Sequence, residues 1–376
     1  MTKLLFVNPP PFFPDSSGGA QRSAMFLFEQ LQQRGWQIEV LCGLSLRSPY
    51  FRRGALKALG QLRSPFGPFL DHDLGYPAWR QPTKFADEAR WQQILDQRLD
   101  AFQPDAVLSQ FQVHCPLLSR AAQRGFPSFY FARNLYLIDD TTVIPEAFHL
   151  IANAPHTAEG LARVTDRPIE VILPFVHPDR YRVSDHQRRY VTFINPVPEK
   201  GVDIALEVAR QLPDQEFLFV KGKWSERRDD YLESLLAPAR SLPNVTIWEN
   251  QADMRTVYRV TRTLLAPSQF IETFGRVILE AQINGIPVVA AQRGGIPYTV
   301  GDGGFLADPY NDPAPYIEAL RTLQDPQVYS DRAARALANA QRPEFDPQQQ
   351  VERFIRTVTA NLSASAPGRS PIPVSR

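Results

Sequence analysis

The sequence has few of the residues that form disulfide frameworks, and it has no membrane-spanning run. Only two cysteines occur among 376 residues, Cys42 and Cys115. So sparse a pair favours buried thiols in a reducing compartment over a disulfide framework, and neither cysteine lies in a catalytic motif. No apolar run approaches the ~18–20 residues that a bilayer span requires. We therefore expect a cytoplasmic protein.

The chain also lacks an excess of charge, and we expect its opening residues to form a strand. Its net charge of +1 at pH 7 provides no overall attraction to nucleic acid, so we expect no nucleic-acid partner. The opening residues, MTKLLFVNPPP, contain too short an apolar run for a secretory signal, which needs ~7–15 residues, and they predict a first strand. Proline is abundant, with 34 residues, and most prolines separate periodic segments of an ordered fold.

The pattern of alternating strands and helices starts twice along the chain. One series begins with a strand at 4–7 and a helix at 20–33, and a second begins with a strand at 190–194 and a helix at 202–212. Such alternation predicts parallel sheets covered by helices. We predict an α/β fold of two Rossmann-like domains facing a central cleft. The predicted boundaries are 1–180 and 181–345 for the domains, 346–362 for a C-terminal helix and 363–376 for a disordered tail.

Several polar or glycine residues of the first half follow predicted strands, where open parallel sheets bind ligands. The loop glycines Gly18 and Gly19 can present backbone amides to an anion, although a plain tight turn is the alternative. The loop lacks G-x-G-x-x-G, which argues against a dinucleotide site. His114, Arg133 and Asn134 are candidates for ligand or phosphate contacts, while a lone histidine is more often structural.

Residues 50–63 combine leucines with basic residues at helical spacing. The leucines could share one face and lie on a membrane surface or an acidic ligand. A solvated surface helix is the alternative that we favour, because two glycines interrupt the segment. Residues 65–82 are rich in glycine, proline and aromatic residues, and they predict a loop that could act as a lid. The leucines are Leu56, Leu59 and Leu62, and the surrounding basic residues are Arg52, Arg53, Lys57 and Arg63.

The stretch 267–285 (PSQFIETFGRVILEAQING) places two carboxylates around the start of a predicted helix. Glu272 lies in the loop and Glu280 lies in the helix, so they can contact different parts of one extended ligand. They could act as acid and base on a glycosidic bond, or as metal ligands, for which no further ligands lie close in the sequence. They could also accept hydrogen bonds from sugar hydroxyls while adjacent amides bind phosphate. A nucleotide sugar has the required length.

This stretch resembles the retaining glycosyltransferases of family 4, which have the GT-B fold. The resemblance covers the C-terminal half of the chain well, and the N-terminal half only as a topology with the Gly18-Gly19 loop. It is carried by the E-x7-E element from Glu272 to Glu280, Pro267-Ser268, Gly285-Ile-Pro-Val-Val, Gly294-Gly295 and the loop Pro198-Glu-Lys200-Gly201.

The resemblance implies a role for each matching residue. Glu272 would bind the hydroxyls of the donor hexose, Glu280 those of the ribose, and Lys200 the diphosphate. A lysine and helix N-terminal amides can stabilise a leaving diphosphate, so we expect neither a metal nor another cofactor. The alternative without a functional role is that Glu280 is a solvated helix residue and Lys200 is a surface charge. The backbone amides of Phe274 and Gly275 would line the sugar and phosphate, and Gly19 would approach the phosphate from the other domain.

Two positions depart from the family pattern. Asn195 occupies the place of an arginine that would also bind the diphosphate, five residues before Lys200. The N-domain histidine of many members is replaced by Arg133-Asn134, so no N-domain catalytic residue is assigned. The cations that could compensate for Asn195 are Lys221, Lys223, Arg276 and Arg293.

The implied activity is transfer of a hexose from a nucleotide diphosphate sugar to an acceptor, with retention at the anomeric carbon. Such enzymes serve polysaccharide or glycolipid biosynthesis, and the acceptor could be a saccharide, a lipid-linked molecule or a small molecule. The alternatives are a nucleotide-sugar epimerase or hydrolase, and a non-catalytic nucleotide-sugar-binding module. Weak contact through residues 50–63 would place the protein at the inner face of the membrane.

Overall fold

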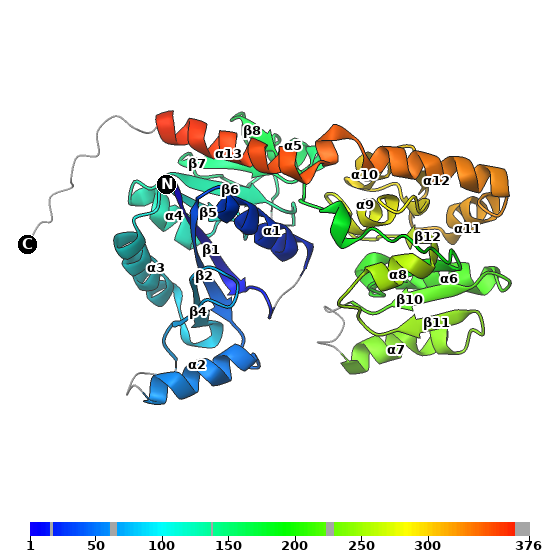
Figure 1. Ribbon diagram of the computed structural model, residues 1–376, viewed down its shortest axis with the longest axis horizontal. Helices are drawn as coiled ribbons and strands as arrows, with labels where there is room; N and C mark the ends of the chain where they lie inside the picture. The colour runs from blue at the N-terminus through cyan, green and yellow to red at the C-terminus, as the bar shows by residue number, and fades with distance from the viewer. Residues whose placement is uncertain (16–17, 61–65, 137, 223–228, 365–376) are drawn as a thin grey trace, which may run out of the picture. The chain divides into compact units, whose positions relative to one another are not determined.

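The chain divides into two compact units (Figure 1). The first comprises Met1–Ile172 with Gln350–Arg376, and the second comprises Leu173–Gln349. We predicted a domain boundary at 180/181, whereas the second unit begins at Leu173. The helix predicted as a separate C-terminal element is part of the first unit. The predicted tail lies outside the described residues from position 365 onward. The computed structural model describes residues 1–15, 18–60, 66–136, 138–222 and 229–364.

The first unit is built on an eight-stranded sheet in the order β3-β4-β2-β1-β5-β6-β7-β8. All neighbouring strands are parallel except β3 and β4. Chain order reverses direction between β1 and β5, which makes the ends of these strands a switch point. The strands are β1 (Lys3–Pro11), β2 (Gln37–Leu44), β3 (Phe69–Asp71), β4 (Ala78–Pro82), β5 (Ala106–Ser109), β6 (Ser128–Ala132), β7 (Phe148–Ala152) and β8 (Ile169–Val171).

The prediction of a loop over residues 65–82 was wrong. Its described part contains β3 and β4, and β4 pairs with β2 so that Arg80 lies opposite Cys42. Arg80 is 1% exposed and forms an ion pair with Asp71. β4 contains polar residues and a proline, so its sequence does not resemble that of a strand. Its strand conformation is stabilised by pairing with the distant β2 and not by local propensity.

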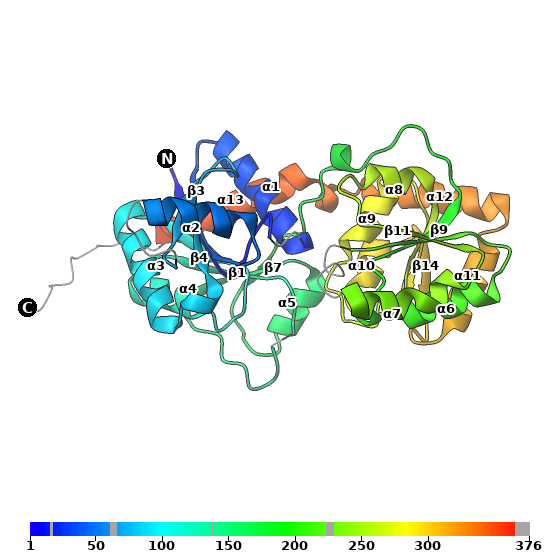
Figure 2. The same ribbon diagram turned by 90° about the horizontal axis from the view of Figure 1, so that it is seen from below.

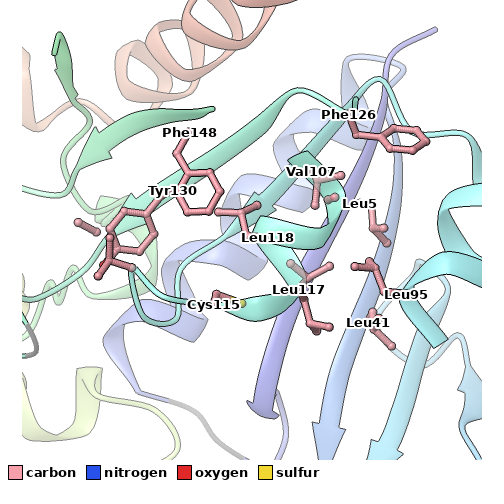
Figure 3. Close-up of a cluster of buried hydrophobic side chains, with 14 of the residues drawn as sticks. Leu5, Leu41, Leu95, Val107, Cys115, Leu117, Leu118, Phe126, Tyr130 and Phe148 are labelled. Carbon is pink, nitrogen blue, oxygen red and sulfur yellow. The ribbon is translucent and has the colours of Figure 1, made fainter. Parts of the chain in front are cut away.

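Helices cover both faces of the first sheet, as Figures 1 and 2 show. Apolar side chains from the strands meet those of α3 and α4 in a buried cluster that includes Leu5, Leu95 and Leu118 (Figure 3). Burial of this surface stabilises the unit by about 25 cal/mol per Å². The helices are α1 (Gly19–Gln33), α2 (Pro49–Gly60), α3 (Glu88–Phe102), α4 (Pro116–Gln123), α5 (Pro155–Leu161) and α13 (Pro347–Ala364).

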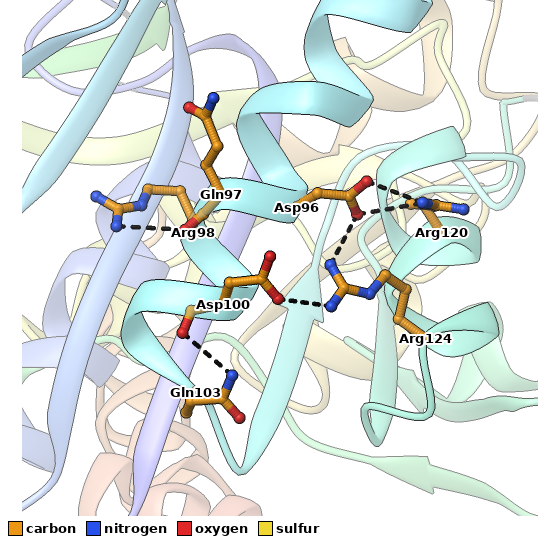
Figure 4. A network of polar contacts seen from close by, with 7 residues as sticks. All are labelled: Asp96, Gln97, Arg98, Asp100, Gln103, Arg120 and Arg124. Atoms are coloured by element: carbon orange, nitrogen blue, oxygen red, sulfur yellow. Dashed lines mark hydrogen bonds and ion pairs between the residues drawn. The ribbon is translucent and has the colours of Figure 1, made fainter. Parts of the chain in front are cut away.

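A charged network joins α3 to α4 at the surface (Figure 4). Asp96 accepts hydrogen bonds from Arg120 and Arg124, and Arg124 also pairs with Asp100 at 2.6 Å. Solvent screens pairs this exposed, and each contributes about 0–1 kcal/mol. The apolar cluster beneath these helices is therefore the main source of their packing energy.

The second unit contains a parallel six-stranded sheet in the order β11-β10-β9-β12-β13-β14. Here the switch point lies between β9 and β12. The strands are β9 (Tyr190–Ile194), β10 (Phe217–Val220), β11 (Val245–Trp248), β12 (Thr261–Ala266), β13 (Val288–Ala291) and β14 (Gly304–Ala307). The helices are α6 (Val202–Gln211), α7 (Asp229–Arg240), α8 (Arg255–Val260), α9 (Arg276–Gln282), α10 (Ile296–Val300), α11 (Pro313–Thr322) and α12 (Pro326–Ala340).

The predicted α/β fold with two Rossmann-like domains is confirmed. Each unit has its own sheet and its own buried cluster. Within the described residues, no helix combines the length and the hydrophobicity needed to cross a bilayer.

Candidate functional site

Two loops meet at the switch point of the second sheet. The loop after β9 ends in a 3-10 turn, Pro198–Lys200, and the loop after β12 leads to α9. Backbone amides of Gln269 and Phe270 donate hydrogen bonds to the carbonyl of Glu199 at 3.0 and 2.9 Å. Gly201 has a φ of 82°, and a β-carbon there would lie 2.0 Å from the Pro267 carbonyl oxygen. Only glycine therefore allows the loops to approach so closely.

These loops bring together Lys200 and Glu272. Lys200 Nζ lies 2.7 Å from Glu272 Oε1, and Ser268 Oγ donates to the same oxygen at 2.9 Å. Burial alone would raise the pKa of Glu272, but the Lys200 charge and the two hydrogen bonds outweigh it and hold this pKa below its ordinary value of 4.5. The side chains keep 31% and 16% exposure, so both charged groups can exchange partners with a ligand.

A glycine turn after β13 supports the Glu272 loop from behind. The Gly295 amide donates to the Glu272 carbonyl at 2.7 Å. A β-carbon on Gly295 would lie only 1.8 Å from the Thr273 carbonyl oxygen. The Phe274 ring is 2% exposed and packs edge-on against Phe345 at 5.8 Å. The buried ring therefore fixes the position of the loop. Because the side chain is buried, only the backbone of Phe274 can contact a ligand.

Gly275 and Arg276 form the start of α9. Gly275 is the N-cap with a φ of 77°, a conformation that favours glycine. The Arg276 guanidinium donates to the Tyr181 hydroxyl at 3.0 Å and lies 3.4 Å from Glu280 Oε1. Arg276 is thus engaged inside the unit.

Glu280 is buried within a polar network, with 6% of its surface exposed. Tyr258 donates its hydroxyl proton to Glu280 Oε2 at 2.9 Å. Burial and the neighbouring carboxylate raise the pKa of Tyr258 well above 10, so the phenol remains a donor. A carboxylate can accept about four hydrogen bonds. The contacts with Tyr258 and Arg276 use only part of this capacity, so the Glu280 carboxylate can accept further hydrogen bonds from a ligand. The alternative that Glu280 is a solvated helix residue is wrong.

The position of the missing arginine is occupied by a constrained asparagine. Asn195 has a φ of 64°, and within the described part of the chain its buried Oδ1 has no hydrogen-bond partner. A β-carbon on Gly222 would lie 2.3 Å from that oxygen, so the Asn195 side chain fills the space beside the end of β10.

The candidate cations that could compensate for Asn195 differ in their surroundings. Lys221 Nζ is bound between Glu233 at 2.7 Å and Glu249 at 2.8 Å, and hydrogen bonds to these carboxylates raise its pKa. Lys223 lies outside the described residues. The Arg293 guanidinium stacks on the Tyr310 ring at 4.2 Å, and its buried Nε has no partner among the residues that the structure describes.

The candidates of the first unit lie at the ends of its strands. Gly18 is the N-cap of α1, and both Gly18 and Gly19 are exposed. His114 is exposed between β5 and α4. Asn134 is exposed and accepts a hydrogen bond from its neighbour Tyr136 N at 3.1 Å, which fits a local turn.

Arg133 belongs to a polar cluster with residues that sequence reasoning missed. Its Nε donates to Gln110 Oε1 at 3.1 Å, and its carbonyl accepts from Asn153 Nδ2 at 3.2 Å. The guanidinium also lies over the Phe131 ring at 3.6 Å. Gln110 and Asn153 are each the first polar residue after a buried strand, a signal that sequence reasoning could have used.

Other partners of the predicted residues carry little sequence signal. Ser268 precedes Glu272 by four residues in the same loop. Tyr258 lies on α8 and Tyr181 lies after β8, both far from Glu280 in the sequence. Their contacts depend on how the helices pack.

Two further observations concern possible metal ligands and the two thiols. The described residues contain no group of three or more histidine, cysteine, aspartate or glutamate side chains that could hold a metal ion. Cys42 and Cys115 are buried free thiols. Burial raises the pKa of Cys42 to about 12, so it forms almost no thiolate at neutral pH.

The site lies in a domain with known relatives. Residues 188–325 match the family described as Glycosyl transferases group 1. This range contains Asn195, Lys200, Glu272 and Glu280. It lies entirely within the second unit.

Solved structures define the fold class as GT-B. A glycosyltransferase from Rickettsia africae superimposes with a TM-score of 0.75 at 13% identity, covering 96% of this chain and 99% of that chain. Anabaena HepE in complex with UDP gives a TM-score of 0.71 at 20% identity, covering 96% and 100%. At these identities the likeness establishes the fold alone.

Sequence relatives are more specific but cover less of the chain. The D-inositol 3-phosphate glycosyltransferase of Mycobacterium sp. (strain KMS) is 32% identical over 195 residues, 46% of this chain and 44% of the relative. The Streptomyces avermitilis protein of the same name is 30% identical over 234 residues, 54% and 50% of the two chains. The chain thus spans about half the length of the curated relatives it matches.

Proposed function

We propose that this protein is a retaining glycosyltransferase that moves a hexose from a nucleotide diphosphate sugar to an acceptor. The observation that carries the proposal is the Lys200–Glu272 pair at the switch point of a glycosyl transferases group 1 domain. A parallel sheet binds ligands at this place. The pair supplies a cation for phosphate and an acceptor for sugar hydroxyls.

Lys200 and Glu272 have complementary tasks in this proposal. The Lys200 ammonium binds the diphosphate and stabilises the negative charge that develops as the nucleotide leaves. Glu272 accepts hydrogen bonds from hexose hydroxyls and orients the anomeric carbon toward the acceptor. Its depressed pKa keeps it ionised at neutral pH. When the donor binds, its phosphate and hydroxyl groups thereby take over part of the contact between the Lys200 ammonium and the Glu272 carboxylate.

The remaining donor contacts come from α9 and the neighbouring loop. Backbone amides at Phe274 and Gly275 face the phosphate and sugar, and Glu280 accepts from the ribose hydroxyls. Tyr258 and Arg276 hold Glu280 in one orientation. Arg293 supplies the second cation, because carboxylates already engage Lys221 and Arg276.

The comparisons suggest which donors and acceptors to test first. HepE has been crystallised with UDP, with UDP and glucose, and with UDP-glucose, so UDP-glucose is the first donor to test. D-inositol 3-phosphate is the first acceptor to test, because the sequence relatives are named for it. Saccharide and lipid-linked acceptors complete the panel.

Calorimetry with UDP, GDP and ADP tests the donor site. We expect the wild type to bind one of them, and Lys200→Ala to weaken that binding at least tenfold, since a hydrogen bond to a charged group contributes about 1.5–3 kcal/mol. Lys84→Ala, which removes an exposed lysine of the first unit, is the matched control and should bind like the wild type. Absence of binding to all three nucleotides would overturn the proposal.

Product analysis separates transfer from the other activities. Donor consumed without an acceptor would identify a hydrolase or an epimerase. Nucleotide binding without turnover on the whole acceptor panel would identify a binding module. The anomeric configuration of the product, measured by NMR against that of the donor, tests retention, and an inverted product would exclude it.

A further inference from the structure

The segment that joins β6 to β7 presents an aromatic side chain to solvent. Tyr136 is 76% exposed, whereas Tyr231 on α7 is 47% exposed. A single exposed aromatic residue is common on protein surfaces and by itself indicates no function. Its surroundings therefore decide whether Tyr136 is a ligand contact.

The two ends of this segment are fixed to the first unit. Leu135 packs against α5, where a β-carbon on Gly160 would lie 2.3 Å from Leu135 Cδ1. Near β7, the guanidinium of Arg167 donates hydrogen bonds to the carbonyls of Glu146 at 2.7 Å and Phe148 at 3.1 Å. A segment held in this way needs little ordering when a ligand binds, which lowers the entropic cost of binding.

Short hydrogen-bonded turns set the backbone around Tyr136. Its amide donates to Asn134 Oδ1 at 3.1 Å. Asp139 Oδ1 accepts from the Thr141 amide at 2.9 Å and from the Thr142 hydroxyl at 3.2 Å. Asparagine and aspartate side chains commonly close turns in this way. The turns thus hold the backbone on both sides of an exposed ring.

Tyr136 follows the carboxyl end of β6, at the edge of the sheet where parallel strands bind ligands. Arg133 begins the same segment. Hydrogen bonds from Thr141 and, to a smaller extent, the neighbouring His114 lower the pKa of Asp139, so the loops after β5 and β6 lie close together. These surroundings suit a ligand that carries hydroxyl groups, and they do not suit an apolar chain. The exposed side chains of the segment are mostly polar: Asn134, Tyr136, Asp139, Asp140, Thr141, Val143, Glu146 and Ala147.

We propose that the Tyr136 ring is a platform on which the acceptor stacks a cyclic polyol, either a sugar or a cyclitol. One face of such a ring exposes C–H groups, which pack on an aromatic face, and its rim carries hydroxyl groups. The Asn134 amide and the carboxylates of Asp139 and Asp140 can exchange hydrogen bonds with these hydroxyls. A tyrosine provides this contact area at a low entropic cost, because it has few side-chain torsions. The inference rests on the proposed function, since it takes the ligand to be the acceptor.

Saturation-transfer NMR without nucleotide tests the proposal, with glucose, maltose, myo-inositol and D-inositol 3-phosphate as probes. We expect the wild type to bind at least one of these rings, and the tightest probe identifies the acceptor ring as a sugar or a cyclitol. Tyr136→Ala should weaken binding at least about fivefold, and Tyr136→Phe should change it less than about twofold, because the aromatic face remains. Tyr231→Ala, at the exposed tyrosine of α7, is the matched control and should bind like the wild type.

Sorbitol carries hydroxyl groups but has no ring face, so it should bind about fivefold more weakly than the tightest ring. Sorbitol that binds as tightly as that ring would overturn the proposal. So would wild-type protein that binds none of the rings, or binding that Tyr136→Ala leaves unchanged. An equal loss in Tyr136→Ala and Tyr136→Phe would assign the contact to the hydroxyl group and would equally exclude stacking. Circular dichroism verifies that the variants fold, as expected for an exposed side chain.

The proposed function and this inference fail separately. Calorimetry with nucleoside diphosphates reports only the donor site, and Tyr136→Ala should leave nucleotide affinity unchanged. Nucleotide binding without ring binding would reject the platform and leave the donor site in place. Ring binding that is lost in Tyr136→Ala, without any nucleotide binding, would retain the platform and reject the transferase.

Discussion

The two units place very different side chains after the strands of their parallel sheets. Each has a parallel sheet whose chain order reverses at its centre, between β1 and β5 in the first unit and between β9 and β12 in the second. The switch point of the second unit carries the Lys200–Glu272 ion pair. The first unit has exposed glycines, His114 and an arginine, Arg133, held by a neutral glutamine.

We propose a division of labour between the units, in which the second unit binds the donor and the first unit binds the acceptor. A fixed pair of opposite charges is suited to the donor, whose diphosphate and sugar are the same from one enzyme to another. An arginine held by neutral amides, together with glycines, is suited to an acceptor, whose chemistry differs between enzymes. The family match at 188–325 covers only the unit with the paired charges. The first unit lies outside that match.

The largest expected effect concerns the buried charges of the second unit. Glu280→Ala should lower the free energy of unfolding by about 3 kcal/mol, because it leaves the Arg276 charge buried without its carboxylate. Urea denaturation measures this change. Gln110→Ala in the first unit, which removes a neutral partner of a charged arginine, should cost only about 1.5 kcal/mol. Equal losses would remove the contrast between the two units.

A substitution at Glu272 tests whether catalysis depends on the second unit. Glu272→Ala should reduce the transfer rate about a hundredfold, as expected when a reacting sugar is poorly positioned, while nucleoside diphosphate affinity changes much less. Initial rates and calorimetry measure the two quantities. Unchanged transfer would refute the role of Glu272, and an equal loss of rate and affinity would make it a general donor contact.

Arg133 provides the matching test in the first unit. Arg133→Ala should lower transfer about tenfold through loss of a charged hydrogen bond, without changing nucleoside diphosphate affinity. The rate should be measured against acceptor concentration. A weakened nucleotide affinity would contradict the division of labour, because it would place Arg133 at the donor.

The smallest expected effect is a pH dependence. The folded-state pKa of Glu272 lies below its ordinary value of 4.5, so this carboxylate contributes stability that is complete above that value. The contribution is lost as pH falls through the lower folded-state pKa. The stability difference between wild type and Glu272→Gln should therefore be constant near neutrality and shrink below pH 4.5. Chemical denaturation at a series of pH values measures it, and a difference that grows at acid pH would contradict it.

Local sequence pattern was enough to identify most of the fold. Apolar periodicity, with the glycines and prolines between segments, predicted the strands at 4–7 and 190–194 and the helices at 20–33 and 202–212. These correspond to β1, β9, α1 and α6. The pattern did not predict β3, β4 or α10. The same pattern placed Lys200 and Glu272 in loops after strands, whereas their joint role at one site was implied by the family resemblance. Because parallel strands align their carboxyl ends, residues 72 positions apart could be placed at one edge of the sheet.

Only the tertiary structure decided what surrounds these residues. Glu280 is buried against Tyr258, and Lys221 is held between two carboxylates. β4 pairs with β2, and α2 turns Leu56 outward. Each of these outcomes depends on contacts between segments far apart in the chain, which local propensity and spacing do not encode. Periodicity reports which residues of a segment share a face, whereas packing determines whether that face meets another element or solvent.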